Sequence, residues 1–169
     1  MWVRLWGICL SLLLLGCGYQ PLARYSEQQF GERIYVDISV NYRDPENSVL
    51  IKDAMLRSIV QRLGAKVATN AKEADSQIHV TLYNVRFASL AENTQGFTSF
   101  YRTFVTLRFR YHDKVGKITE MDTIGRHTFS IDTQSILTDT RRLEAIEEAS
   151  IQALDAFFAK IATLPKPKG

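Results

Sequence analysis

The chain has 169 residues, with 21 Lys plus Arg against 18 Asp plus Glu and a formal net charge of +3 at pH 7. This small excess excludes a function carried by overall charge, such as bulk attraction to nucleic acid, so any electrostatic function must come from local clusters. The length is enough for one domain with a core of its own.

A predicted export signal opens the chain and ends at a cysteine. The apolar run Leu5–Leu15 follows Arg4 and is shorter than the ~20 residues that a helix needs to cross a bilayer. Residues 1–16 are therefore predicted to be a secretory signal peptide. The letters LLG before Cys17 resemble the lipobox of bacterial lipoproteins, although Leu15 stands where those proteins usually have a small residue. The resemblance implies cleavage before Cys17, which then carries a diacylglycerol and an acylated amine, and more than one lipid chain makes anchoring stable. The alternative is an uncleaved anchor or an ordinary signal peptide with a chance cysteine.

Cleavage at this point also removes Cys9, so the exported chain has no disulfide and its fold must rest on its core. The 153 residues that remain suit one domain, which at this size buries about 68–70% of its unfolded surface. Residues 18–32 show neither helical nor strand periodicity. We therefore expect an acylated N-terminus and tether at 17–32, one domain at 33–163 and an exposed tail at 164–169.

A strand and a helix are the first regular elements. Residues 33–40, RIYVDISV, alternate apolar and polar side chains, which indicates a half-buried strand. A helix is predicted from Pro45, which suits the first helical position after the capping Asp44, to the terminator Gly64. Its apolar residues fall on one face: Val49, Leu56, Ile59, Val60 and Leu63. The letters AKVAT that follow are compatible with an extra edge strand, and NAKEAD with a turn.

Three longer strand patterns fill the middle of the chain. In residues 76–87, SQIHVTLYNVRF, the apolar parity switches near Tyr83, which predicts a bulge or a strong twist. The loop from Ala88 to Thr98 is long for a hairpin, and long ordered loops are often functional. A turn with the letters DKVGK joins a strand at 99–112 to a returning strand at 118–131.

Gly125 in the returning strand is expected to mark a bulge, because Ile124 and Phe129 differ in parity. A second amphipathic helix is predicted within residues 140–162. The order of elements predicts an α+β fold, a two-layer sandwich with two helices on one face of a mostly antiparallel four-stranded sheet. The strands on either side of the first helix are candidates for parallel neighbours joined by a right-handed crossover.

Several segments together resemble the LptE family of lipopolysaccharide-assembly lipoproteins. They are the CGYQP start at Cys17, the strand IYVDISV, the helix SVLIKDAMLRSIVQRLG, the letters EADSQIHVTLYNV, and two long hairpin strands before a C-terminal helix. The resemblance spans nearly all of the mature chain. It implies a plug inside the large outer-membrane β-barrel LptD, which assists folding of the barrel and binds lipopolysaccharide on its way to the outer leaflet.

The resemblance also implies a location. The protein is expected to be lipid-anchored in the outer membrane, with its domain on the periplasmic side or inside the barrel lumen. Gly18, and not Asp, follows the cysteine. Under the enteric sorting rule, a lipoprotein without Asp at this position is sent to the outer membrane.

The strand at 99–112 presents a surface suited to this ligand. Lipopolysaccharide carries phosphates beside acyl chains, and Arg is the best side chain for bidentate phosphate contacts. The candidate lipopolysaccharide-binding residues are Arg102, Arg108 and Arg110, which share one parity, and Arg86 and Arg126, which extend the patch if the bulges allow. Phe100 and Phe104 lie on the same parity. The alternative is an ordinary solvated face whose arginines pair with Glu120 or Asp122 across the hairpin.

The loop between the long strands is the candidate partner contact. In the LptE family, loops at one end of the sandwich reach toward the barrel lumen. The resemblance implies the same role for Glu92, Asn93, Thr94, Gln95, Gly96 and Phe97. A solvated loop without a partner is the alternative.

Catalytic motifs are lacking. His79, His112 and His127 lie in separate strands or at strand ends, and no pair has the i, i+4 spacing of a helical metal site. We therefore expect no enzyme activity, no cofactor, no metal and no nucleic-acid partner. Two rival functions stay open: an activator or scaffold of a periplasmic cell-wall synthase, and an auxiliary lipoprotein of a phospholipid ABC transport system.

Overall fold

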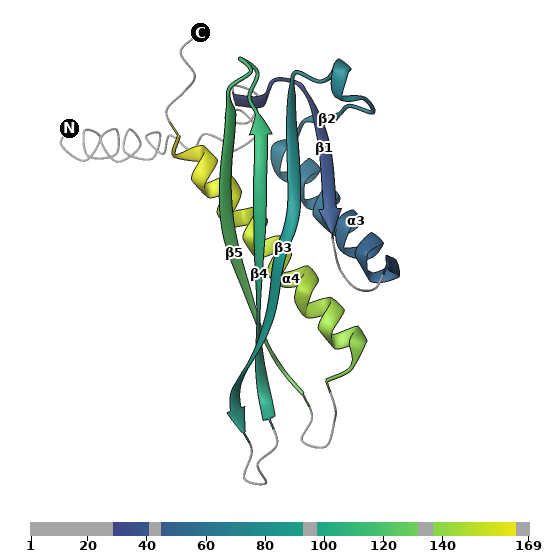
Figure 1. Ribbon diagram of the computed structural model, residues 1–169, viewed down its shortest axis with the longest axis vertical. Helices are drawn as coiled ribbons and strands as arrows, with labels where there is room; N and C mark the ends of the chain where they lie inside the picture. Colours follow the sequence, from purple (N-terminus) through teal and green to yellow (C-terminus); the bar gives the residue numbers. More distant parts are fainter. Residues whose placement is uncertain (1–28, 41–44, 93–97, 132–136, 165–169) are drawn as a thin grey trace, which may run out of the picture.

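The structure, a computed structural model, describes residues 29–40, 45–92, 98–131 and 137–164. Within these residues two helices cover one face of a five-stranded sheet (Figure 1), which confirms the α+β prediction. The elements are β1 (Arg33–Val40), α3 (Pro45–Leu63), β2 (Lys66–Val67), the 3-10 turn η1 (Ala71–Glu73), β3 (Ser76–Glu92), β4 (Thr98–His112), β5 (Ile118–Ser130) and α4 (Asp139–Ala162).

The strand order is β2-β1-β3-β4-β5. β1 pairs in parallel with β2 and β3, whereas β3, β4 and β5 form antiparallel pairs. The expected four-stranded, mostly antiparallel sheet is therefore corrected to a mixed sheet of five strands. The additional strand lies in the AKVAT segment and pairs only Lys66 and Val67 with β1, and two residues are too few for alternation to identify a strand. The parallel pairing of β1 with β3 is as the element order indicated.

The core lies between the sheet and the two helices. Along β4 every second residue from Thr103 to Tyr111 is buried, whereas Arg108 and Arg110 between them are exposed. Phe157 of α4 stacks on Phe109 of β4, with ring centroids 3.9 Å apart. Each large apolar side chain that is fully buried contributes about 1.5–3 kcal/mol. One face of the sheet therefore holds the fold together, and the opposite face is left as open surface.

The two predicted bulges have different outcomes. The β3–β4 register shifts between Leu82 and Asn84, so the irregularity expected near Tyr83 is confirmed. The β4–β5 register is continuous, so the bulge expected at Gly125 is wrong. Gly125 instead lies where the backbone of α4 comes very close to the sheet, since a Cβ built there would lie 1.8 Å from the carbonyl oxygen of Ala149.

The long hairpin continues further than the sequence indicated. β3 runs to Glu92, which pairs with Thr98 at the start of β4, so residues 88–92 belong to the strand and not to a loop. Further register shifts between Ser89 and Glu92 interrupt the alternation, which explains why the strand pattern was not visible there. We call this end of the sheet distal, and the end where β4 meets β5 proximal.

The chain enters the domain at the proximal end. Phe30 is fully buried and packs edge-on against Tyr111, although the sequence assigns it to the tether. The backbone N–H groups of Glu32 and Arg33 donate to the Asp75 carboxylate, both at 2.9 Å. The predicted signal peptide, Cys17 and most of the predicted tether and tail lie outside the described residues. In the part of the chain that the structure describes, no helix is long and apolar enough to cross a membrane.

Candidate functional site

The face of the sheet that points away from α3 and α4 carries the predicted site residues. We call it the outer face. On β4 it is formed by the even-numbered residues, and on β3 and β5 by their register partners. All five arginines of the predicted patch lie on it: Arg86, Arg102, Arg108, Arg110 and Arg126. The structure therefore brings these residues together, but it divides them into two groups with different partners.

The distal group surrounds an aromatic ring. Arg86 and Arg126 are the register partners of Phe104 on its two sides, and their guanidinium carbons lie 4.2 and 5.9 Å from the centroid of that ring. Arg102, two residues before Phe104, donates from Nε to the Thr128 hydroxyl at 3.0 Å. We call Arg86, Arg102 and Arg126 the distal arginines. Among the described residues, no carboxylate forms an ion pair with any of them.

The bulge in β3 is what places Arg86 in this group. Before the bulge the even-numbered residues of β3, such as Leu82, face the core. The register shift between Leu82 and Asn84 exchanges the parity, so the even-numbered Arg86 points outward opposite Phe104. Without the shift, its guanidinium would be directed at the helices.

The proximal group is neutralised by β5. Arg108 donates from Nε and from one terminal nitrogen to the two oxygens of Asp122, both at 3.0 Å. This hydrogen bonding holds the pKa of Asp122 below its ordinary value of 3.8 and raises the pKa of Arg108. Arg110 Nε lies 3.4 Å from a carboxylate oxygen of Glu120. Both cross-strand pairs that the sequence offered as the alternative are present, and an anionic ligand would have to compete with these carboxylates.

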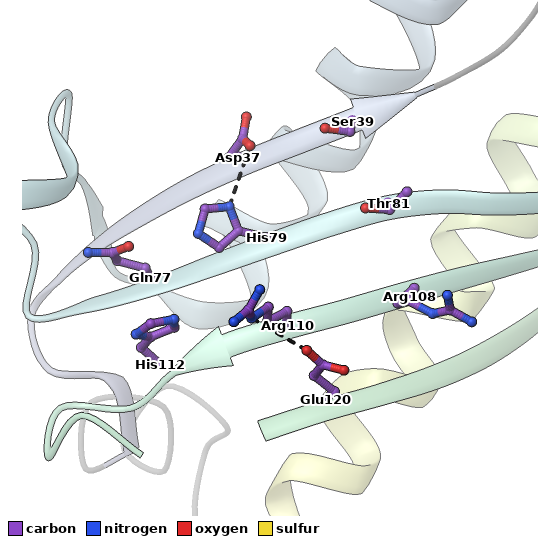
Figure 2. A pocket seen from close by; sticks show the side chains of 9 residues that line it. All are labelled: Asp37, Ser39, Gln77, His79, Thr81, Arg108, Arg110, His112 and Glu120. Carbon is purple, nitrogen blue, oxygen red and sulfur yellow. Dashed lines mark hydrogen bonds and ion pairs between the residues drawn. The ribbon is translucent and has the colours of Figure 1, made fainter. Parts of the chain in front are cut away.

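A polar pocket of about 620 Å³ opens on the proximal half of the outer face (Figure 2). Four register partners cross it in the order acid, base, base, acid: Asp37 of β1, His79 of β3, Arg110 of β4 and Glu120 of β5. His79 Nδ1 lies 3.4 Å from an oxygen of Asp37. The other residues that line the pocket are Ser39, Gln77, Thr81, Arg108 and His112. Guanidinium, imidazole, amide and hydroxyl groups in one recess suit hydrogen bonding to phosphate oxygens or sugar hydroxyls.

The sequence did not assign Asp37, His79 or His112 to a site. They come from three strands, and only the strand register brings them together. His127 does not line this pocket. Its ring lies beside that of Phe129, with ring centroids 6.1 Å apart. Within the described ranges, no group of three His, Cys, Asp or Glu side chains is placed to hold a metal ion.

Exposed apolar side chains accompany the arginines. Phe100 of β4, Tyr83 of β3 and Ile124 of β5 are all exposed, and the Arg108 guanidinium lies 3.9 Å from the centroid of the Tyr83 ring. The outer face is therefore amphipathic as well as cationic. Of the predicted partner loop, Glu92 is the last residue of β3, and residues 93–97 lie outside the described part of the chain.

The domain matches a known protein family. The model of the LptE family, whose description is lipopolysaccharide assembly, matches residues 32–161. The chain belongs to the LptE family. The matched range includes all five strands of the sheet and α3, as well as α4 up to its penultimate residue, so LptE membership covers the whole two-layer domain.

Solved structures similar to this LptE domain include other lipoproteins. The rare lipoprotein B from Shewanella oneidensis has 15% identity and a TM-score of 0.49, covering 76% of this chain and 94% of that one. A putative lipoprotein from Caulobacter crescentus CB15 has 12% identity and a TM-score of 0.49, covering 85% and 94%. Lipoprotein B from Nitrosomonas europaea has 17% identity and a TM-score of 0.41, covering 78% and 79%. A search of curated proteins found no match.

Proposed function

We propose that this protein is a non-enzymatic, lipid-anchored protein of the outer membrane that acts in lipopolysaccharide assembly together with an LptD-like β-barrel. The observation that carries the proposal is the LptE match over residues 32–161. The lipobox-like letters before Cys17 support the anchor, because an acylated cysteine at this position holds the domain at the membrane surface.

The outer face supports a lipopolysaccharide contact. Its distal half combines three guanidinium groups that lack a described carboxylate partner with the rings of Phe100 and Phe104. Guanidinium groups bind phosphate oxygens through paired hydrogen bonds, and the aromatic rings offer apolar area to acyl chains. Arg108 and Arg110 already have carboxylate partners. We therefore place the phosphates of the ligand on the distal arginines.

The shape of the sheet supports a plug inside a barrel. β4 has 15 residues, which corresponds to about 50 Å of extended chain. The hairpin of β3 and β4 extends beyond both helices (Figure 1). A narrow tip of this kind suits entry into a barrel lumen, with Glu92 and residues 93–97 making the contact with the wall.

The test is a mild-detergent purification of the acylated protein from its native outer membrane, followed by mass spectrometry of the proteins that accompany it. A large β-barrel in stoichiometric amount is the expected partner. Recovery of a cell-wall synthase or of inner-membrane transport components in its place would contradict the proposal and favour the rival functions. Cys17→Ser is the control for the anchor and should leave the folded domain in the soluble fraction.

A further inference from the structure

The turn between β4 and β5 exposes apolar and basic side chains together at the proximal end of the sheet. Val115 is 57% and Ile118 49% exposed, and Lys114 and Lys117 beside them are exposed as well. We call residues 114–118 the proximal turn. Neither Val115 nor Ile118 belongs to the hydrophobic core. Core packing therefore does not account for the apolar side chains in this turn.

Most N–H groups of the proximal turn have hydrogen-bond partners within the protein. All five N–H groups from residue 113 to residue 117 donate hydrogen bonds within the protein: two to the carboxylate of Asp113, two to carbonyl oxygens of the turn and one to the carbonyl of Gln29. Asp113 is only 5% exposed, so its charge is held inside the turn. Backbone donors without partners are costly away from water. Because the N–H groups of residues 114–117 already have partners, bringing this part of the turn against a less polar surface leaves none of these donors unpaired.

The proximal turn lies beside the point where the chain enters the domain. The Lys114 N–H donates to the carbonyl oxygen of Gln29, the first described residue, at 3.3 Å, and the burial of Phe30 fixes the chain there. Residues 18–28 connect this point to Cys17 and span at most about 40 Å when fully extended. A membrane that holds a lipid on Cys17 is therefore within reach of the turn.

We propose that the proximal turn docks into the headgroup region of the bilayer that holds the Cys17 lipid. Val115 and Ile118 enter the border of the acyl chains, and Lys114 and Lys117 contact anionic headgroups. The inference rests on the lipid anchor of the proposed function. Each basic side chain near an anionic surface strengthens binding about fivefold, and the tether raises the local concentration of the turn at the bilayer. Two lysines and two apolar side chains are then enough to hold the proximal end of the domain at the bilayer surface.

The chain offers a clean spectroscopic test. Its two tryptophans, Trp2 and Trp6, precede Cys17, so Val115→Trp places the only indole of the mature protein in the turn. The acylated mature protein is reconstituted into vesicles of phosphatidylcholine and phosphatidylglycerol that carry bromine near the top of the acyl chains. Interfacial side chains lie about 5–10 Å into this boundary, so we expect blue-shifted emission and loss of intensity through bromine quenching.

The matched control is Tyr83→Trp on the outer face, where the native residue is 60% exposed. Its emission is expected to stay unquenched. Adding Lys114→Glu and Lys117→Glu to Val115→Trp is expected to reduce quenching in the anionic vesicles. If Val115→Trp does not fold, as judged by circular dichroism, Ile118→Trp takes its place.

Two results would overturn the inference, and they are distinguishable. Protein that floats with the vesicles but shows no more quenching than the Tyr83→Trp control refutes docking of the turn and leaves the proposed function standing. Mass spectrometry of the same sample reports the acyl groups on Cys17. A mature chain without them refutes both the anchor and the docking that depends on it.

Discussion

Gly125 of β5 lies directly against the backbone of α4 at Ala149. A Cβ built on Gly125 would come 1.8 Å from the carbonyl oxygen of Ala149 and 2.5 Å from the amide nitrogen of Ala153. No side chain fits between the strand and the helix at this point. The hydroxyl of Thr123 donates to the carbonyl oxygen of Ala153 at 2.7 Å close by, and this bond depends on the same close approach.

Gly125→Ala is therefore expected to lower the free energy of unfolding by about 1–3 kcal/mol or more, because the backbone of α4 must move to admit the methyl group. Chemical denaturation of the purified mature domain measures the change. The adjacent Ile124 is 55% exposed, and Ile124→Ala should stay within about 0.5 kcal/mol of the native protein. Equal changes in the free energy of unfolding for the two substitutions would contradict the close packing of α4 against Gly125.

Gly31 and Gly116 form a matched pair for a second test. Both have positive φ, +82° and +81°, but a Cβ on Gly31 would lie 2.5 Å from the Cβ of Asp75, whereas one on Gly116 would meet nothing within 4 Å. Gly116→Ala is expected to cost only the strain of the left-handed backbone, about 1–2 kcal/mol. Gly31→Ala should cost more, because it also displaces Asp75. Thermal unfolding of both variants gives the comparison, and equal costs would refute the close packing at Asp75.

Thr103 carries a buried hydroxyl that has no hydrogen-bond partner among the described residues. Thr103→Val keeps the shape of the side chain and removes the unsatisfied group, so it is expected to raise the free energy of unfolding by about 1 kcal/mol. Thr103→Ser keeps the hydroxyl and removes a methyl group, so it should destabilise the domain. A loss of stability in the Val variant would reveal a partner for the hydroxyl.

Asp75 links the entry of the chain to acid stability. The hydrogen bond from the Arg33 N–H, joined by one from Glu32, holds the pKa of Asp75 below its ordinary value of 3.8. Because the folded pKa is the lower one, the stabilisation is complete above the ordinary value and is lost as pH falls through the folded pKa. Asp75→Asn should be less stable at about pH 7 and lose less stability on acidification to about pH 3. Denaturation curves at both pH values, with exposed Asp53→Asn as the control, test this; parallel losses would contradict it.

The division of the arginines predicts unequal contributions to lipopolysaccharide binding. Arg86→Gln combined with Arg126→Gln should weaken lipopolysaccharide binding about tenfold or more. The substitutions remove charge-assisted hydrogen bonds to the ligand for which no described carboxylate of the protein competes. Arg108→Gln combined with Arg110→Gln is the matched pair, and its effect should be smaller because Asp122 and Glu120 are already bound there. Titration of each purified variant with lipopolysaccharide measures the difference. Unchanged binding in the first variant would remove the distal arginines from the site.

β4 shows which structural features a local sequence pattern predicts and which it does not. Its alternation placed Arg102, Arg108 and Arg110 on one face correctly, because side chains along a strand alternate whatever the strand pairs with. The same reasoning failed at Gly125, where a difference in parity between Ile124 and Phe129 was attributed to a bulge. Ile124 is an exposed apolar residue on the outer face, and a pattern of apolar letters does not distinguish it from a core residue.

The sequence by itself determined the cysteine after an apolar run, both helices with most of their apolar faces, the three long strands and the shared parity of Arg102, Arg108 and Arg110. These features are local, because alternation, capping and helical periodicity involve residues only a few positions apart. The sequence missed that Val49, expected on the apolar face of the first helix, is exposed. Only the tertiary structure decided the parallel pairing of β2, the row that joins Asp37 to Glu120, and the partners of each arginine. These depend on strand register, and register is set by the packing of α3 and α4 against one face of the whole sheet.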